Sequence, residues 1–123
     1  MTRQTAACAA FVVAVLAALP ALAADSGDTL FRRYCSVCHD TAAGKNKIGP
    51  SLAGIVGRPS GDEAGFTYSA AMQSAGLTWD DKTIDQYITD PRSLVPGNKM
   101  LFPGVKDPAE RKAIIDYLNT LKS

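Results

Sequence analysis

Cys35-Ser36-Val37-Cys38-His39 is the stretch that decides the fold of this 123-residue chain. Two thiols stand three positions apart, and an imidazole follows the second one directly. Positions i, i+3 and i+4 of a helical turn share one side, so these three side chains can face the same way. Covalent attachment of haem requires this arrangement, with the sulfurs on the two vinyl groups of one edge and the imidazole turned toward the iron. The stretch predicts one haem c, bound covalently through Cys35 and Cys38, with His39 as an axial iron ligand.

Three other interpretations of this stretch explain less. A structural zinc site needs about four Cys or His ligands. After residue 23 the chain has only three such residues, Cys35, Cys38 and His39. A thioredoxin-like dithiol requires a preceding strand in a βαβ context, and the sequence predicts neither. A local disulfide would leave the adjacent histidine without an explanation.

Since His39 is the only histidine of the chain, the opposite face of the iron must be met by Met, Lys, Tyr, water or nothing. Two methionines after residue 23 compete for it. Met72 stands among alanines in a short predicted helix, where filling a gap in the core is the usual role of methionine. Met100 follows residues 96–99, Pro-Gly-Asn-Lys, a loop of turn-forming residues in which an apolar side chain should point at something. We therefore expect Met100 to be the second axial ligand.

Residues 1–23 have the pattern of a secretory signal peptide, in which a basic residue precedes an apolar stretch and an Ala-x-Ala pattern ends the segment. An uncleaved anchor is the alternative, because residues 6–24 are nearly long enough to span a bilayer at ~20 residues. The alanine-rich composition favours cleavage after Ala23, export to the periplasm and a mature domain over residues 24–123. Cys8 is interpreted as a small apolar residue of the leader.

Beyond the leader the chain is electrically neutral and rich in loop-forming residues. All 12 acidic residues and all but one of the 13 basic residues lie there, together with all 10 glycines. This balance argues against a polybasic nucleic-acid binder. The length and the glycine content predict one small domain of short helices and long loops.

Helical patterns occupy four segments, and no segment after residue 24 alternates polar and apolar residues as a half-buried strand would. The predicted helices cover residues 29–35, 69–74, 78–90 and 107–121. Asp28 is expected to cap the first helix, and Asp107 the fourth. A capping-box pattern from Thr78 to Asp81 marks the start of the third helix, and Pro91 ends it. Residues 40–66 and 91–106 are predicted to be loops, so the fold class is all-α.

Several further motifs follow the haem-binding stretch in a specific order. They are Gly49-Pro50-x-Leu52, Gly65-Phe66-x-Tyr68, Trp79, Pro96-Gly97-x-Lys99-Met100 and Tyr117-Leu118. With these motifs, residues 26–123 resemble the class I c-type cytochromes, the small soluble cytochromes of bacteria and mitochondria. The resemblance implies the cytochrome c fold, with three to five short helices and long loops wrapped around one haem. It also implies a contact between the first and last helices through Gly27, Phe31, Ile114 and Tyr117.

The resemblance further implies roles around the haem. Pro50 should offer its carbonyl to the ring of His39. Arg58, Tyr68 and Trp79 should donate to the haem propionates, whose burial requires donors. A solvated cation at Arg58 and an ordinary core residue at Trp79 are the alternatives.

Three more positions bear on the second axial ligand. Tyr87 resembles the tyrosine that bonds near the methionine sulfur, and core packing is its alternative role. Met72 and Asn98 depart from the family pattern, which commonly has Asn and Thr there, near a buried water. These departures leave the reduction potential open.

An iron held on both faces by His39 and Met100 has no free coordination site, which favours transfer of single electrons over binding of a substrate. The predicted function is a soluble one-electron carrier and not an enzyme. A haem peroxidase or a sensor of small gases would need an open axial site. A dedicated electron-transfer subunit of a periplasmic dehydrogenase is the alternative.

Charge is segregated along the body of the chain. Residues 31–58 contain five basic residues and one acidic residue, whereas residues 60–90 contain one basic residue and six acidic ones. By resemblance, the rim of the exposed haem edge should contain Lys45, Lys47, Lys99 and Lys106. We expect a monomer that docks through this rim on a membrane quinol–cytochrome c reductase and on a terminal oxidase or reaction centre. Scattered, solvated lysines are the alternative, and neither nucleic acid nor stable membrane insertion after cleavage is expected.

Overall fold

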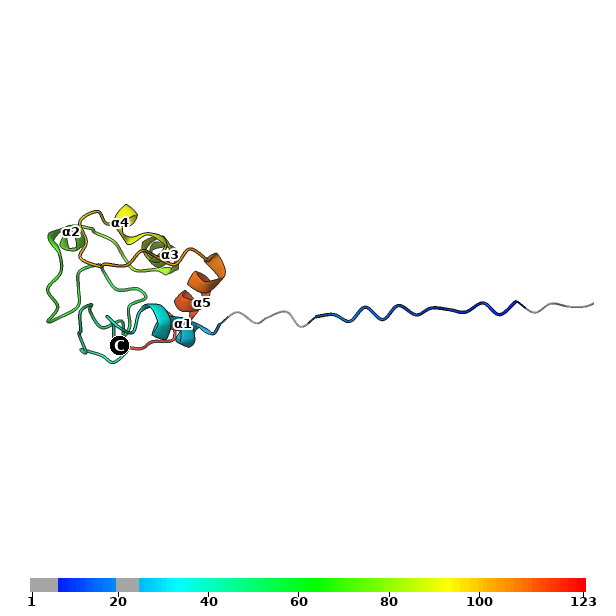
Figure 1. Ribbon diagram of the computed structural model, residues 1–123. Coiled ribbons are helices and arrows are strands. Elements are labelled where there is room, and N and C mark those ends of the chain that lie inside the picture. The colour runs from blue at the N-terminus through cyan, green and yellow to red at the C-terminus, as the bar shows by residue number, and fades with distance from the viewer. Residues whose placement is uncertain (1–6, 20–24) are drawn as a thin grey trace, which may run out of the picture.

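The computed structural model describes residues 7–19 and 25–123. Within these ranges the regular structure is helical, with one isolated β-bridge and no strand (Figure 1). The helices are α1 (Gly27–Tyr34), α2 (Ala70–Gln73), α3 (Asp81–Thr89), α4 (Pro91–Leu94) and α5 (Pro108–Leu118). The predicted all-α fold of short helices and long loops is confirmed.

Helix α1 begins two residues before the predicted start, so the expected cap at Asp28 is wrong. Ser26 occupies the cap position, with extended backbone at φ −67° and ψ 155°. Asp28 lies in the first turn instead, where its carboxylate accepts hydrogen bonds from Ser26 and Arg32. A negative charge in a first turn is favourable because the helix N-terminus carries partial positive charge.

Helix α3 begins later than its sequence pattern predicts. Asp80 and Thr83 form the capping box, and Thr78 does not take part as the cap. Thr78 pairs with Pro59 in the β-bridge, and the backbone N–H of Trp79 donates to the Arg58 carbonyl at 2.9 Å. These extended contacts exclude helical backbone before Asp80.

The predicted loop over 91–106 contains the short helix α4, which the sequence analysis missed. Pro91 is its first residue, and the side chain of Asp90 accepts a hydrogen bond from Ser93 N–H. Proline suits the first position of a helix because it lacks the N–H that would be unpaired there. Pro91 therefore both terminates α3 and starts α4.

Helices α1 and α5 lie side by side and meet at a glycine (Figure 1). A Cβ on Gly27 would overlap the carbonyl oxygen of Ala113 and lie 2.8 Å from Cβ of Tyr117. One turn further along, the rings of Phe31 and Tyr117 pack with centroids 5.4 Å apart. This contact, expected from the resemblance, fixes α1 and hence the thiols that follow it.

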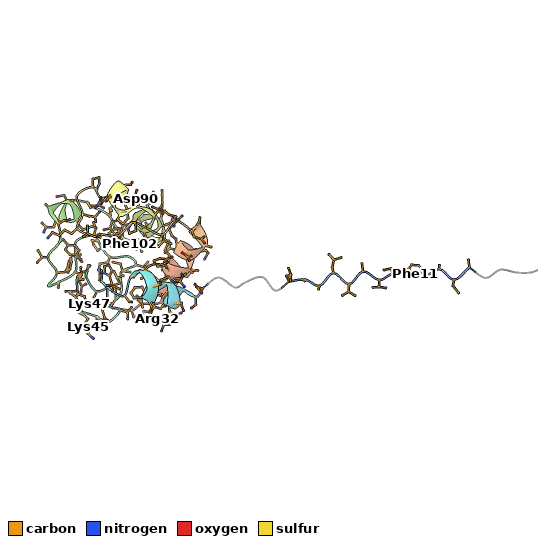
Figure 2. The ribbon with its side chains drawn as sticks, in the orientation of Figure 1. Phe11, Arg32, Lys45, Lys47, Asp90 and Phe102 are labelled. Carbon is orange, nitrogen blue, oxygen red and sulfur yellow. The ribbon has the colours of Figure 1, made fainter. Side chains whose placement is uncertain are left out.

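The core lies between α1, α3 and α5, with Leu30 and Ile114 at most 1% exposed. Residues 7–19 are exposed and form no helix; Figure 2 shows Phe11 on this segment, away from the helices. Among the described residues, no helix has the length and apolar character needed to cross a membrane. The predicted cleavage position after Ala23 lies outside the described residues.

Candidate functional site

His39 follows the turn that ends α1, and its ring is held by the backbone of a distant loop. Its Nδ1 lies 2.7 Å from the carbonyl oxygen of Pro50. A carbonyl only accepts, so Nδ1 carries the proton and Nε2 keeps its lone pair. Burial lowers the pKa of His39, against the opposing effect of the Pro50 hydrogen bond. The ring is thus neutral, in one tautomer, with one nitrogen available for a metal.

The two thiols lie on the tight turn between α1 and His39. Backbone N–H groups of Cys38 and His39 both donate to the carbonyl of Cys35, at 3.1 and 2.9 Å. Both thiols are half-buried and form no disulfide, and burial raises the pKa of Cys35 to about 11. The described residues contain no group of three or more His, Cys, Asp or Glu side chains able to hold a metal ion.

Gly49 packs directly against the imidazole ring of His39, because it has no side chain. A Cβ at this position would overlap the ring of His39. The backbone N–H of Gly49 also donates to the Cys38 carbonyl at 2.7 Å. The Gly49-Pro50 motif does not predict this contact, because packing of a ring against a glycine ten residues away has no local signal.

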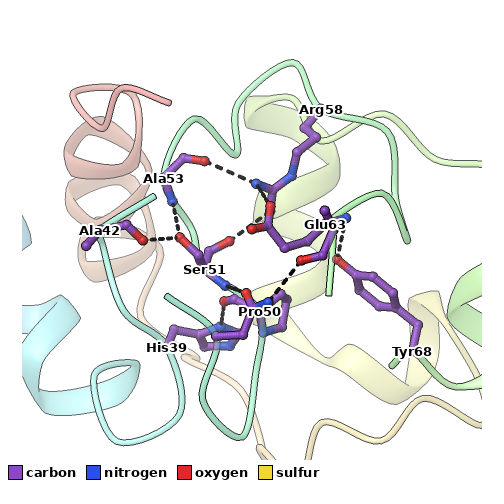
Figure 3. Close-up of polar contacts among 10 residues, drawn as sticks. His39, Ala42, Pro50, Ser51, Ala53, Arg58, Glu63 and Tyr68 are labelled. Carbon is purple, nitrogen blue, oxygen red and sulfur yellow. Dashed lines mark hydrogen bonds and ion pairs between the residues drawn. The ribbon is translucent and has the colours of Figure 1, made fainter. Parts of the chain in front are cut away.

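A polar network connects Arg58 to the segment after Pro50 (Figure 3). The guanidinium donates to the carbonyl oxygens of Ser51 at 2.9 Å and Ala53 at 3.1 Å. It also pairs with the carboxylate of Glu63 at 2.8 Å. The Tyr68 hydroxyl accepts a hydrogen bond from the backbone N–H of Glu63 at 3.0 Å. Arg58 and Tyr68, both predicted site residues, are thus joined by Glu63, which the sequence analysis missed.

Trp79 and Tyr87 form an aromatic pair, with ring centroids 5.0 Å apart. Trp79 is 7% exposed, and burial raises the pKa of Tyr87 to about 12. Neither the indole N–H nor the Tyr87 hydroxyl bonds to another described residue, and neither polar atom is sealed from solvent. Among residues 7–19 and 25–123, these two donors predicted from the resemblance therefore have no partner.

Met100 is half-buried in the loop after α4, where Asn98 holds its backbone. The Met100 N–H donates to Oδ1 of Asn98 at 2.8 Å. The amide of Asn98 donates in turn to the carbonyls of Pro91 at 3.1 Å and Val95 at 2.8 Å. Asn98, noted in the sequence only as a departure from the family pattern, ties the Met100 loop to α4. Met72 belongs instead to the core cluster and is 8% exposed.

Comparison with known proteins identifies the family to which this chain belongs. The family model described as Cytochrome c matches residues 24–122. The chain belongs to the cytochrome c family. The resemblance to class I c-type cytochromes, and the cytochrome c fold that it implies, are both confirmed.

Individual members of the cytochrome c family support the assignment. Cytochrome c2 iso-2 of Magnetospirillum molischianum is 51% identical over 88 residues, which are 72% of this chain and 91% of that protein. Cytochrome c2 of Rhodopila globiformis is 48% identical over 96 residues, 78% of this chain and 91% of that protein. The structure of cytochrome cH from Methylobacterium extorquens is 42% identical and superposes with a TM-score of 0.72, covering 76% of this chain and 94% of that one.

Membership of the cytochrome c family implies one covalently attached haem c, and the residues present fit that group. Cys35 and Cys38 are free thiols on one turn. His39 presents a neutral ring whose Nδ1 is occupied by a carbonyl. Within the described residues, Trp79 retains an unused donor, which suits a group with anionic carboxylates. The predicted cofactor is therefore confirmed.

The four lysines expected on the rim of this cytochrome differ in their contacts. Lys47 donates to the Ser36 carbonyl and Lys106 to the Thr89 carbonyl, at 2.7 and 2.6 Å. Within the described part of the chain, the ammonium groups of Lys45 and Lys99 make no hydrogen bond or ion pair, and both residues are exposed. Figure 2 shows Lys45 and Lys47 on the same side of the molecule.

Proposed function

We propose that this member of the cytochrome c family is a soluble one-electron carrier and not an enzyme, with His39 and Met100 as its axial iron ligands. The observation that carries the proposal is the hydrogen bond from His39 Nδ1 to the Pro50 carbonyl, which leaves Nε2 as the free ring nitrogen. Haem c supplies a reversible one-electron change of oxidation state when it is bound. If His39 and Met100 both bind the iron, no position on the metal would remain for a substrate.

The side chains around the haem have distinct proposed roles. Cys35 and Cys38 anchor the group through two thioethers. The thioether of Met100 is a soft, neutral ligand, so it favours the ferrous state and raises the reduction potential. Pro50 orients the proximal imidazole by its carbonyl.

Four further residues are proposed to contact the haem or its methionine ligand. Arg58, Tyr68 and Trp79 donate to the propionates, and Tyr87 donates near the sulfur of Met100. The unused donors of Trp79 and Tyr87 support their part of this assignment. Arg58 uses three of its five N–H donors in hydrogen bonds to other described residues, which leaves two for a propionate.

We also propose the compartment and the redox partners of this carrier. Residues 1–23 direct export and are removed, which leaves the cytochrome domain over 24–123 in the periplasm as a monomer. Its partners are a membrane quinol–cytochrome c reductase and a terminal oxidase or reaction centre. Docking uses the basic rim, which comprises Lys45, Lys47, Lys99 and Lys106. Relatives named cytochrome c2 support a bacterial carrier of this kind.

A visible spectrum in both oxidation states, combined with a potentiometric titration, tests this function. We expect reversible one-electron behaviour and, in the ferric protein at neutral pH, the absorption band of a methionine–iron bond. Absence of that band, or a haem that cannot be cycled, would refute the carrier with His/Met ligation. Purification of the native protein as a free monomer, and not within a dehydrogenase, would separate the carrier from the subunit.

A further inference from the structure

Arg58 and Glu63 form an ion pair that is largely removed from solvent. The two side chains are 15% and 14% exposed, and Nη1 lies 2.8 Å from Oε2. Surface ion pairs contribute little because water screens them, but a pair at this burial depends strongly on both partners. The pair lies in the same network as the segment that holds His39 (Figure 3).

The guanidinium of Arg58 also forms hydrogen bonds with the segment over 51–53. It donates to the carbonyls of Ser51 and Ala53, two residues apart. Ser51 is completely buried, its Oγ donates to the Ala42 carbonyl at 2.7 Å, and its N–H donates to Asn46 at 2.9 Å. The planar fork of a guanidinium can hold several acceptors in one fixed geometry, which a flexible ammonium does not do.

The hydrogen bonds of Arg58 are connected to the imidazole of His39 through one peptide unit, between Pro50 and Ser51. The carbonyl of Pro50, which accepts from His39 Nδ1, and the N–H of Ser51 belong to the same peptide plane. A peptide unit is rigid, so a displacement of Ser51 tilts the Pro50 carbonyl. Arg58 holds Ser51 from the other side of its Cα, through the Ser51 carbonyl.

Glu63 keeps the guanidinium in this position. Its carboxylate is the one anionic partner of Arg58 within the described residues, and its own backbone N–H is held by the Tyr68 hydroxyl. Without the carboxylate, a charged guanidinium at this depth would shift toward its remaining anionic acceptor, the proposed haem propionate, or toward water, and would release the two carbonyls.

We infer that Glu63 is a positioning residue for the iron ligand, acting through Arg58 and the segment 50–53 to hold the Pro50 carbonyl on His39. The inference rests on the proposed ligation of iron by His39. It assigns a function to a residue that touches neither His39 nor the haem-binding thiols. It also gives a role to a carboxylate that lies beside Arg58, a proposed donor to the haem propionates.

Hydrogen exchange of the His39 Nδ1–H in the ferrous, haem-loaded protein tests the inference by NMR. The test variant is Glu63→Gln, which keeps the shape and removes the charge. The control is Asp62→Asn, which removes the neighbouring exposed carboxylate. We expect exchange of the Nδ1–H to accelerate about tenfold in Glu63→Gln, as a loss of about 1.4 kcal/mol in the closed state would produce. Exchange should not change in Asp62→Asn.

Backbone amides of α5 provide the reference for global opening. A positioning role requires that His39 Nδ1–H accelerates more than the amides of Ile114 and Leu118 in the same sample. Unchanged exchange at His39, or acceleration only in step with α5, would overturn the inference. If Glu63→Gln does not fold, Glu63→Asp replaces it: a local acceleration supports the inference, and its absence overturns it. A wild-type spectrum without histidine ligation would instead refute the proposed function, and the inference with it.

Discussion

The two candidate methionines differ in what surrounds them. Met72 lies in α2 within the core cluster, and its N–H is capped by the Ser69 hydroxyl at 3.1 Å. Met100 lies in a loop whose backbone is tied to α4 through Asn98. A side chain on a fixed, half-buried loop is available to a ligand, whereas a core methionine already fills space. This contrast supports Met100 as the proposed axial ligand.

Replacement of each methionine separates these roles. Met100→Ala should abolish the methionine–iron band of the ferric protein and lower the reduction potential by about 59 mV or more, a tenfold change in the equilibrium for one electron. Met72→Leu should keep the band, because the substitution conserves apolar volume. Spectra and potentiometric titrations of the two variants make the measurement. A band that survives in Met100→Ala would contradict the ligand assignment.

Tyr87 should make stability depend on alkaline pH. Burial raises its pKa from 10.0 to about 12, so the folded protein holds the phenol proton more tightly than the unfolded chain does. The resulting stabilisation is fully present below pH 10 and is lost as the pH rises from 10 to about 12. Urea denaturation of the wild type and of Tyr87→Phe across this range measures the effect. Parallel pH profiles for the two proteins would show that Tyr87 does not cause it.

At the scale of elements, the crossing of α1 and α5 determines where the haem-binding turn stands. The thiols and His39 follow α1 directly, so any change in the distance between the two helices moves them together. Gly27 permits the close approach, because a Cβ there would overlap the backbone of Ala113. The position is governed by space and not by backbone conformation, since this glycine is helical.

Gly27→Ala should therefore destabilise the protein, by about 1–3 kcal/mol, as overpacking of a well-packed contact does. Helix propensity alone predicts the opposite sign, because alanine favours a helix by about 1 kcal/mol over glycine. Chemical denaturation of the haem-loaded protein decides between these effects. A variant as stable as the wild type would contradict the packing argument.

At the scale of the whole molecule, the neutral net charge of the body conceals a basic part and an acidic part. Residues 31–58 have five basic residues and one acidic residue, and they include two of the proposed rim lysines. Helix α3 belongs to the acidic part. A protein with separated charges orients as it approaches an oppositely charged partner, which raises the association rate at low salt.

Charge reversal on each part tests the docking proposal. Lys99→Glu should slow electron transfer with an acidic redox partner about threefold or more at low ionic strength, and the difference should fall as salt is added. Lys82→Glu, on the exposed surface of α3, makes the same change of charge away from the rim and should have a smaller effect. Equal effects of the two substitutions would favour net charge over a specific docking surface.

The helices show how far local patterns extend. The cap at Asp107 and the first-turn proline of α5 were predicted correctly, because both depend on residues that are adjacent in sequence. The start of α3 was wrong, because Thr78 and Trp79 pair with residues 58 and 59, about twenty positions away. Helix α4 has no clear sequence signal, because Pro91 both ends α3 and begins this four-residue helix.

The sequence by itself determined the haem, the two thiols and the helical fold class, and it identified His39 as the candidate iron ligand. Covalent attachment depends on side chains within five consecutive positions, so a short stretch contains the whole signal. Only the tertiary structure decided which backbone groups hold those side chains. The contact of Gly49 with His39, the hydrogen bonds of Arg58 to Ser51 and Ala53, and the hydrogen bond of Asn98 to Val95 join parts of different turns and loops. Such contacts depend on the path of the folded chain, which no local spacing specifies.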